Sequence, residues 1–418
     1  MDDVLADLEA RGLIHDTTDR AALAARLASG PIVLYHGCDP TADSLHVGNL
    51  IGLLVLRRFQ DAGHRPVALA GGATGMVGDP SGRSEERNLL EAASLAANVA
   101  AIKGQISQVL GPEGPWVLVD NMEWTAPVRL LDFLRDVGKH ATVGQMLARE
   151  SVRARLASDQ GISYTEFTYM LLQANDYLHL YRHHGCELQI GGSDQWGNII
   201  SGVDLIRRAT GATVHALSWP LLTAPDGSKL GKTTGARTWL AAERTSPFEL
   251  YQHFFNVDDR QVRQHLCWFT LLPVAEISEI VAAHEAAPER REAQRRLALE
   301  ATALVHGRAE ADAAAASAMA WTDDLGPEAF RAREGHFPTT YLDGAADLGL
   351  AGLLVRTGLA ASKGAGRRLV QQGGVRVNGA SVTDPDLVLD PSDFVEGRWL
   401  LLGVGKRNRH VVVLGESS

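Results

Sequence analysis

Residues 31–70 decide the fold of this chain and read PIVLYHGCDPTADSLHVGNLIGLLVLRRFQDAGHRPVALA. The apolar run 31–35 predicts a short buried strand, which is followed by a loop rich in Gly, Pro, Asp and Thr. Apolar residues at helical spacing then predict a helix from about His46 to Ala62, and residues 66–70 predict a second buried strand. A strand, loop, helix and strand at this spacing predict parallel βαβ units in an open α/β sheet.

Further strands of the same sheet are predicted at 116–119 and 187–190, and helical patterns fill the segment between them, including 166–182. We therefore expect a Rossmann-like α/β domain with a parallel sheet over residues 1–225, carrying a helical insert at about 120–185. Such sheets bind ligands outside the carboxyl ends of their strands, so the loops that leave these ends are the first place to look for a site.

The residue composition of the chain changes in its second half. Residues 246–321 are dense in Ala, Glu, Arg and Leu, so an α-helical domain is expected over 226–340, ending in a linker at about 322–340. The tail, 345–418, is expected to form a small α+β domain, because a predicted helix at 362–372 precedes a Gly-Gly turn and a short strand.

Length and composition fit a globular protein. The 418 residues, 45% hydrophobic and 22% charged, predict two or three domains. No apolar run approaches the roughly 20 residues that span a bilayer, and the acidic start of the chain lacks the pattern of a signal peptide. The three cysteines, Cys38, Cys186 and Cys267, form no Cys-x-x-Cys pair, so neither a disulfide framework nor a zinc knuckle is expected. The cytoplasm is the expected compartment.

Charge is unevenly distributed along the chain. The formal net charge is −10, but residues 345–418 hold 9 Lys and Arg against 7 Asp and Glu, whereas the other 344 residues hold 31 against 43. A mildly basic tail on an acidic body is compatible with a local contact to nucleic acid.

The first motif lies where the strand at 31–35 gives way to a helix. Gly48, near the start of that helix, allows close approach to the backbone, and a helix N-terminus favours phosphate. His46 in the first turn could donate to a phosphate oxygen. A motif this short is more often an ordinary helix start with a surface histidine.

The second motif is the polar loop 225–233, which reads PDGSKLGKT. Lys229 and Lys232 could bring two ammonium groups to a polyphosphate. A Walker A loop would need glycine at position 226, which is Asp226, so a P-loop is rejected. On its own the segment is more typical of a solvated lysine loop.

Two Gly-rich segments also follow predicted strands, 191–198 (GGSDQWGN) and 78–82 (GDPSG). Asp194 and Gln195 could close on a small ligand, and Asp79 is placed to face the same crevice. The alternative is an ordinary Gly-rich turn in each case.

The predicted helix at 166–182 carries Tyr169, Gln173 and Asp176 at i, i+4 and i+7, hence on one face. If this face is turned to the crevice, it makes a pocket for an ammonium and a hydroxyl group; if it is turned to water, it has no such role. The histidines of the segment 183–186 lack a second ligand pair for tetrahedral zinc, so no metal site is expected.

In order and spacing, these segments resemble class I aminoacyl-tRNA synthetases. Residues 46–49 (HVGN) resemble the HIGH signature, although Asn49 replaces its second histidine. Residues 229–233 (KLGKT) resemble the KMSKS loop, although they end in Leu-Gly-Lys-Thr and not in Met-Ser-Lys-Ser. Finer matches to bacterial tyrosyl-tRNA synthetases lie at 39–46, 78–82 and 191–198. Residues 358–378 resemble a small RNA-binding module that is shared with a ribosomal small-subunit protein.

The resemblance implies an enzyme that activates L-tyrosine with MgATP and transfers it to tRNA(Tyr). By this resemblance, residues 1–225 are the catalytic domain with a dimerisation insert. Residues 226–340 contain the signature lysine loop, the anticodon-binding domain and a linker, and residues 345–418 form an RNA-binding domain. It also implies a homodimer, with ATP and Mg²⁺ as substrate and no tightly held protein-ligated metal. No contact with a membrane is expected.

The resemblance also implies roles for individual residues. The residues expected to act on the phosphates are Thr41, His46, Asn49, Arg83, Arg87, Lys229, Lys232 and Thr233. The residues expected to bind tyrosine are Tyr35, Asp79, Tyr169, Gln173, Asp176 and Gln189. The residues expected to shape the ATP and adenylate site are Asp39, Gly48, Gly192, Asp194, Gln195 and Lys232, and those expected to contact tRNA are Lys363, Arg367 and Arg368.

Three alternatives stay open at this point. A tryptophanyl synthetase shares the signatures, but the pairing of Asp176 with Tyr35 favours a phenol over an indole. An RNA-binding relative without catalysis would keep the fold, yet the charged residues of the motifs are intact. The tail could also be a structural cap, although Lys363, Arg367 and Arg368 favour contact with the tRNA backbone.

Overall fold

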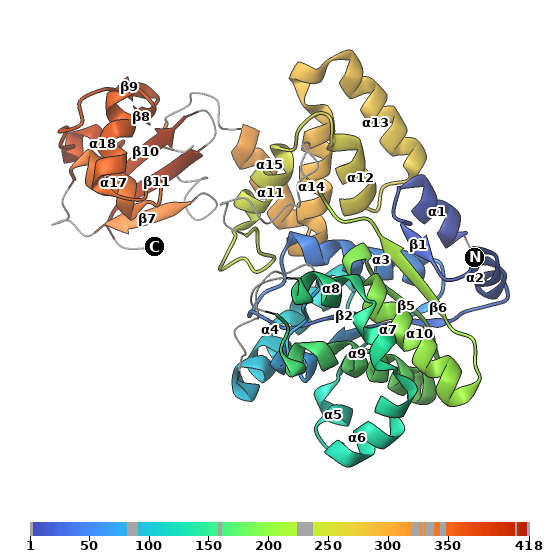
Figure 1. Ribbon diagram of the computed structural model, residues 1–418. Helices are drawn as coiled ribbons and strands as arrows, with labels where there is room; N and C mark the ends of the chain where they lie inside the picture. Colours follow the sequence, from blue (N-terminus) through green and yellow to red (C-terminus); the bar gives the residue numbers. More distant parts are fainter. Residues whose placement is uncertain are drawn as a thin grey trace. The chain divides into compact units, whose positions relative to one another are not determined.

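A computed structural model shows two compact units (Figure 1), Met1–Ala241 with Val257–Glu300, and Ala242–Asn256 with Ala301–Ser418. No helix in its described part is long and apolar enough to cross a membrane. The described residues are 3–81, 91–157, 161–223, 237–319, 326, 327, 330, 338–342, 348–405 and 408–415.

A six-stranded sheet forms the centre of the first unit, in the order β1-β6-β5-β2-β3-β4. All neighbouring pairs are parallel except the short β1 with β6, which confirms the predicted parallel sheet. Neither β1 nor β6 was predicted, since β6 reads HALSW and β1 has only two residues. The strands are β1 (Asp16–Thr17), β2 (Val33–Cys38), β3 (Arg65–Ala70), β4 (Val117–Asp120), β5 (Cys186–Gly192) and β6 (His215–Trp219).

Helices cover both faces of this sheet (Figure 1). Helix α3 (Val47–Asp61) packs on β2 and β3, while α9 (Tyr164–His184) and α10 (Trp196–Thr210) pack on β5. Because both faces are covered, β3 and β6 are buried along almost their whole length. The other helices around the sheet are α1 (Val4–Ala10), α2 (Arg20–Ala28) and α4 (Ala92–Leu110).

The connection from β4 to β5 is helical, as predicted for the insert. Helix α9 begins where the Ser163 hydroxyl accepts from the Glu166 backbone N–H at 3.2 Å, and it ends at Gly185 with φ +64°. These caps fix the limits of the helix that carries the predicted polar triplet. The shorter helices of the insert are α5 (Met122–Thr125), α6 (Leu130–Asp136), α7 (Val143–Leu147) and α8 (Glu150–Leu156).

The predicted helical stretch in the second half of the chain is confirmed over its described residues. Helix α11 starts with a capping box between Ser246 and Glu249, with Pro247 at its first position. The helices are α11 (Pro247–Phe255), α12 (Val262–Phe269), α13 (Val274–Ala286), α14 (Glu292–His306) and α15 (Arg308–Met319).

The tail forms a five-stranded sheet in the order β7-β11-β10-β8-β9, with helices α17 (Leu350–Arg356) and α18 (Lys363–Gln371). Strand β7 (Thr339–Leu342) begins in the last two residues of the predicted linker and ends before residue 345, so the linker prediction is wrong at its end. The reason is that β7 pairs in parallel with the distant β11, which no local pattern reveals. The other strands are β8 (Val375–Val377), β9 (Ala380–Val382), β10 (Trp399–Val404) and β11 (Asn408–Leu414).

Candidate active site

The predicted crevice lies at the carboxyl ends of β2, β3, β4 and β5, which end at Cys38, Ala70, Asp120 and Gly192. The chain builds β3 and β4 on one side of β2, and β5 and β6 on the other. A reversal of strand order of this kind separates the loops that leave β2 and β5, and open α/β sheets bind their ligands in the resulting crevice.

Helix α9 meets the loop after β2 at Asp39. The Tyr169 hydroxyl donates to Asp39 Oδ2 at 3.1 Å, and the Thr74 hydroxyl donates to Asp39 Oδ1 at 2.8 Å. Glycine is required at position 71, because a Cβ there would lie 2.3 Å from both Asp39 Oδ1 and Thr74 Oγ1. The structure thus joins Tyr169, expected to bind tyrosine, to Asp39, expected in the adenylate site.

Asp176 is buried on the same helix. Its carboxylate accepts hydrogen bonds from Asn121 Nδ2 at 2.9 Å and from Trp124 Nε1 at 2.8 Å. Burial raises the pKa of this carboxyl to about 7; the two hydrogen bonds lower the pKa, and neighbouring carboxylates raise it. Sequence reasoning missed both donors, because they follow β4 and no motif marks them.

Two polar atoms in adjacent strands are buried without a hydrogen-bond partner in the described part of the chain, Tyr35 Oη in β2 and Gln189 Oε1 in β5. These residues face each other in the ladder between the strands. Burial raises the pKa of the Tyr35 phenol, and the charge of Asp176 adds to the shift. An unpaired buried hydroxyl is unfavourable, so a ligand that bonds Tyr35 Oη would be stabilised there.

The two Gly-rich loops face each other across Asp79, which is buried. Asp79 Oδ2 accepts from Gln195 Nε2 at 2.6 Å, and Oδ1 accepts from Asn198 Nδ2 at 3.3 Å. The backbone N–H of Ser81 also donates to Oδ1, at 2.9 Å. Asn198 was not among the predicted site residues, although it closes the motif that contains Gln195.

His46 is the N-cap residue of α3 and not part of its first turn, which corrects the prediction. Asn49 Oδ1 accepts from the His46 backbone N–H at 3.0 Å, so Asn49 helps to hold the start of the helix. The imidazole lies over Gly48, since a Cβ there would be 2.9 Å from His46 Cε1. Burial, and then the charge of Arg237, lowers the pKa of His46 to about 4, so the ring is neutral near pH 7.

The chain after the lysine loop runs beside this helix start. The backbone of residues 238–241 bonds to residues 44–47, and the Trp239 ring meets the His46 ring at a centroid distance of 6.3 Å. The segment that follows the predicted KMSKS-like loop therefore lies next to the HIGH-like segment. The predicted residues Arg83, Arg87, Lys229, Lys232 and Thr233 lie outside the described residues.

The remaining predicted residues lie on the loops and the helix that border the crevice. Gln173 is half-buried one turn from Tyr169, while Thr41 and Asp194 are exposed. Gly192 lies close to Asp194, whose Oδ1 would be 2.8 Å from an added Cβ. Contacts of these residues with a ligand stay predictions.

In the tail domain, α18 exposes all three predicted basic residues, Lys363, Arg367 and Arg368. Arg367 forms an ion pair with Asp386 at 2.6 Å. Because both partners are exposed, the pair contributes little to stability and does not prevent Arg367 from contacting a phosphate.

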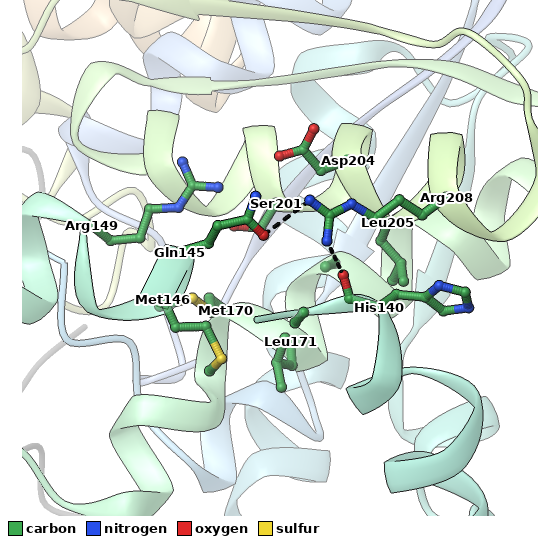
Figure 2. A pocket seen from close by; sticks show the side chains of 12 residues that line it. His140, Gln145, Met146, Arg149, Met170, Leu171, Ser201, Asp204, Leu205 and Arg208 are labelled. Carbon is green, nitrogen blue, oxygen red and sulfur yellow. Dashed lines mark hydrogen bonds between the residues drawn. The ribbon is translucent and has the colours of Figure 1, made fainter. Parts of the chain in front are cut away.

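A separate hollow is lined in part by Met170 and Leu171 of α9 (Figure 2). The Arg208 guanidinium at its rim donates to the His140 carbonyl and to Gln145 Oε1. Its volume of about 30 Å³ is too small for a tyrosine side chain, and it is lined by none of the predicted site residues. The hollow is therefore not the substrate site.

Comparison with known proteins agrees with this geometry. Residues 27–321 match a family model described as tRNA synthetases class I (W and Y), and residues 330–412 match one described as the tyrosine–tRNA ligase SYY-like C-terminal domain. The tyrosine–tRNA ligase of Opitutus terrae is 50% identical over 420 residues, covering 98% of this chain and 99% of its own. That of Mycobacterium tuberculosis is also 50% identical over 420 residues, covering 97% of each chain.

A solved structure shows the same relationship. The C-terminally truncated mitochondrial tyrosyl-tRNA synthetase of Aspergillus nidulans has 34% sequence identity and a TM-score of 0.69, covering 76% of this chain and 94% of that one. The chain therefore belongs to the class I aminoacyl-tRNA synthetases of the tryptophan and tyrosine group. Within that group it falls among the tyrosine–tRNA ligases, which match it over nearly its full length.

Proposed function

We propose that the crevice binds tyrosine with its phenolic hydroxyl between Tyr35 and Asp176. The observation that carries this proposal is the buried Asp176 carboxylate, held by Asn121 and Trp124, next to a Tyr35 hydroxyl that has no partner in the described part of the chain. A phenolic hydroxyl could donate to the carboxylate and accept from Tyr35 at the same time.

Tyrosine–tRNA ligases work in two steps. First, a carboxylate oxygen of tyrosine attacks the α-phosphorus of MgATP, and pyrophosphate leaves as tyrosyl-adenylate forms. Then the terminal ribose hydroxyl of the tRNA attacks the tyrosyl carbonyl carbon, and AMP leaves. The substrates supply both nucleophiles, and Mg²⁺ arrives with ATP. The protein therefore contributes positioning and stabilisation of charge on phosphate oxygens.

The hydroxyl pair would also exclude phenylalanine. A site built to bond a hydroxyl leaves its own polar groups unpaired when the hydroxyl is missing, which is a large penalty in a buried pocket. Tyrosyl-tRNA synthetases are themselves the standard example of this principle.

The α-ammonium of tyrosine is proposed to bind at the opposite side of the pocket. Tyr169 and Asp79 supply an oxygen acceptor each, and Gln173 lies on the same face of α9 as Tyr169. Asp39, Gln195 and Gly192 stand at the loops through which the adenylate would extend toward the helix N-terminus.

The phosphates are proposed to bind at the start of α3, where Thr41, His46 and Gly48 lie at a helix N-terminus, the kind of site that favours phosphate. Lys229, Lys232, Thr233, Arg83 and Arg87 are proposed to close over them. Support for this comes from residues 238–241, which follow the lysine loop in the sequence and bond to residues 44–47.

The decisive experiment is ATP–pyrophosphate exchange with tyrosine, phenylalanine and tryptophan, repeated with Asp176→Ala. Exchange with tyrosine alone, strongly weakened in the variant, is the expected result. Equal exchange by the variant and the natural protein would contradict the assignment of the hydroxyl pocket.

A homodimer through the helical insert is also proposed. The insert exposes apolar side chains that a globular surface seldom leaves open, with Leu130 71%, Leu131 76% and Val143 61% exposed. Leu131→Asp should convert the dimer to a monomer in sedimentation at micromolar concentration. Val388→Asp is the control, because Val388 is 67% exposed in the tail domain. A natural protein that sediments as a monomer would refute the proposal.

The tail is proposed to bind the tRNA backbone through α18. Replacing Lys363, Arg367 and Arg368 together by Gln should reduce the slope of log affinity against log salt by about 2, since each phosphate contact contributes roughly 0.7–0.9. Arg20→Gln on α2 is the control, and an unchanged slope would leave the tail as a structural cap.

The functional division of the chain is proposed to be 1–225 catalytic, 226–340 anticodon-binding and linker, and 345–418 RNA-binding with the addition of β7. The cytoplasm is the proposed compartment. Its support is that Cys38, Cys186 and Cys267 are all free thiols.

A further inference from the structure

Three histidines near the end of α9 form a ring cluster that continues outward from Asp176. The His179 imidazole stacks on the Trp124 indole with a centroid distance of 4.3 Å and an interplanar angle of 9°. His183 lies 4.3 Å from His179, and His184 lies 6.5 Å from it. His179 lies outside the motifs quoted from the sequence, and the proposed catalytic scheme does not use the cluster.

Trp124 is the residue that links the cluster to the pocket. Its Nε1–H donates to Asp176 Oδ1 at 2.8 Å, while its ring carries the His179 stack. Asp176 and His179 lie three residues apart on α9, hence on neighbouring positions of one face. Helix α9 therefore carries both of these contacts of Trp124: Asp176, which accepts its N–H, and His179, on which its ring stacks.

The segment that carries Trp124 is anchored at its start by the buried Asn121, whose side chain bonds to Asp176, to the Thr74 hydroxyl and to the Ala73 backbone N–H. Helix α5 has four residues and none of them is buried, and the next helix, α6, also has no buried residue. The indole packs partly against the core cluster around Tyr177. Asn121 fixes the backbone ahead of Trp124, whereas the indole ring itself is contacted by the His179 stack and by the core cluster, so the stack contributes to the direction of the N–H.

The stack is uncharged under ordinary conditions. Burial lowers the pKa of His179 to about 4, and the neighbouring His183 and His184 lower it in the same direction. The ring therefore adds no positive charge near the Asp176 carboxylate at pH 7.

We propose that His179 is a positioning residue for tyrosine selection. By stacking on Trp124, it directs the indole N–H to one oxygen of Asp176, and this hydrogen bond keeps the carboxylate oriented toward the substrate hydroxyl. The proposal rests on the proposed role of Asp176 in reading that hydroxyl. It predicts that the ring of His179 matters and its nitrogen atoms do not, because stacking geometry alone carries the effect.

The first test compares His179→Ala with His179→Phe in pyrophosphate exchange with tyrosine and phenylalanine. His179→Ala should raise the KM for tyrosine by about 3- to 10-fold, lower the preference over phenylalanine by a similar factor and leave kcat within about twofold. His179→Phe should restore both values, and His184→Ala is the control, with no change expected. Equal loss of kcat in both His179 variants, or an unchanged KM in His179→Ala, would overturn the proposal.

The second test asks whether the effect passes through Trp124. Trp124→Phe keeps an aromatic ring but removes the N–H, so His179→Ala should change the tyrosine KM little further in that background. Fully additive effects would refute the positioning role. Asp176→Asn distinguishes failure of the proposed pocket from failure of the role of His179. If Asp176→Asn leaves tyrosine selection intact, the proposed pocket is wrong. If Asp176→Asn abolishes selection and His179→Ala has no effect, only the role of His179 is wrong.

Discussion

At the proposed hydroxyl end of the crevice Asp176 is buried and bonded to neighbouring side chains, whereas at the proposed phosphate end the start of α3 is partly exposed and bonds to residues 238–241. Asp176 has two fixed donors, Asn121 and Trp124, in a site closed to water. His46 and Gly48, by contrast, are half-buried and exposed respectively, and their loop partners come from a distant segment. With the proposed roles, selection of the amino acid would depend on buried geometry, and activation on groups gathered at a partly exposed helix start.

The largest effect is expected at the phosphate end. His46→Ala should lower kcat of pyrophosphate exchange by about 10²- to 10³-fold, because a donor aimed at developing phosphate charge acts mainly in the transition state. The KM for tyrosine should stay within about twofold. His15→Ala, at an exposed site, is the control. If the loss appeared in KM for tyrosine instead, the contrast between the two ends would be broken.

Asp176→Asn should act on selection. Loss of a charged hydrogen bond in a buried pocket is worth about 1.5–3 kcal/mol, so kcat/KM for tyrosine should fall by about 10- to 100-fold while that for phenylalanine changes little. Asp136→Asn, at an exposed position on α6, is the matched control. A parallel fall for both amino acids would show that Asp176 supports the fold and not the choice of substrate.

The raised pKa of Asp176 predicts a pH dependence. Since the carboxyl is protonated below its folded pKa of about 7, kcat/KM for tyrosine should fall by up to about tenfold as pH drops from 8 to 6. The same linkage makes its contribution to folding stability greatest in acid and smaller as pH rises through 7. The control is kcat/KM for ATP at saturating tyrosine, which should change less with pH. If kcat/KM for tyrosine did not change between pH 6 and 8, the raised pKa of Asp176 would be contradicted.

The smallest effect is expected for Tyr35→Phe. Removing the Tyr35 hydroxyl should raise KM for tyrosine by about 2- to 10-fold, the worth of one neutral hydrogen bond. Urea unfolding should show unchanged or slightly higher stability, because this hydroxyl is buried without a partner in the described structure. Tyr177→Phe is the contrasting variant: its hydroxyl donates to the His215 carbonyl at 2.8 Å, so stability should fall. Equal destabilisation by both variants would show that the Tyr35 hydroxyl is satisfied.

Local patterns predicted the elements that carry the site but not all the contacts between them. The strand, loop and helix at residues 31–62 and the polar face of α9 follow from periodicity and turn residues, and the structure has them. Asn121 and Trp124 were missed, because their importance comes only from lying beside Asp176, more than 50 residues away. The β7 strand was missed for the same reason, since its pairing partner is β11.

By itself, the sequence determined the parallel α/β sheet, the helix that begins at the HVGN segment, and the family to which the motifs point. Only the tertiary structure decided that Asp176 is enclosed by two donors, that the Tyr35 hydroxyl has no partner among the described residues, and that residues 238–241 lie beside His46. The physical reason is range. Periodicity, capping and turn preference act over a few residues, whereas hydrogen bonding, desolvation and stacking depend on which distant segments the fold brings together.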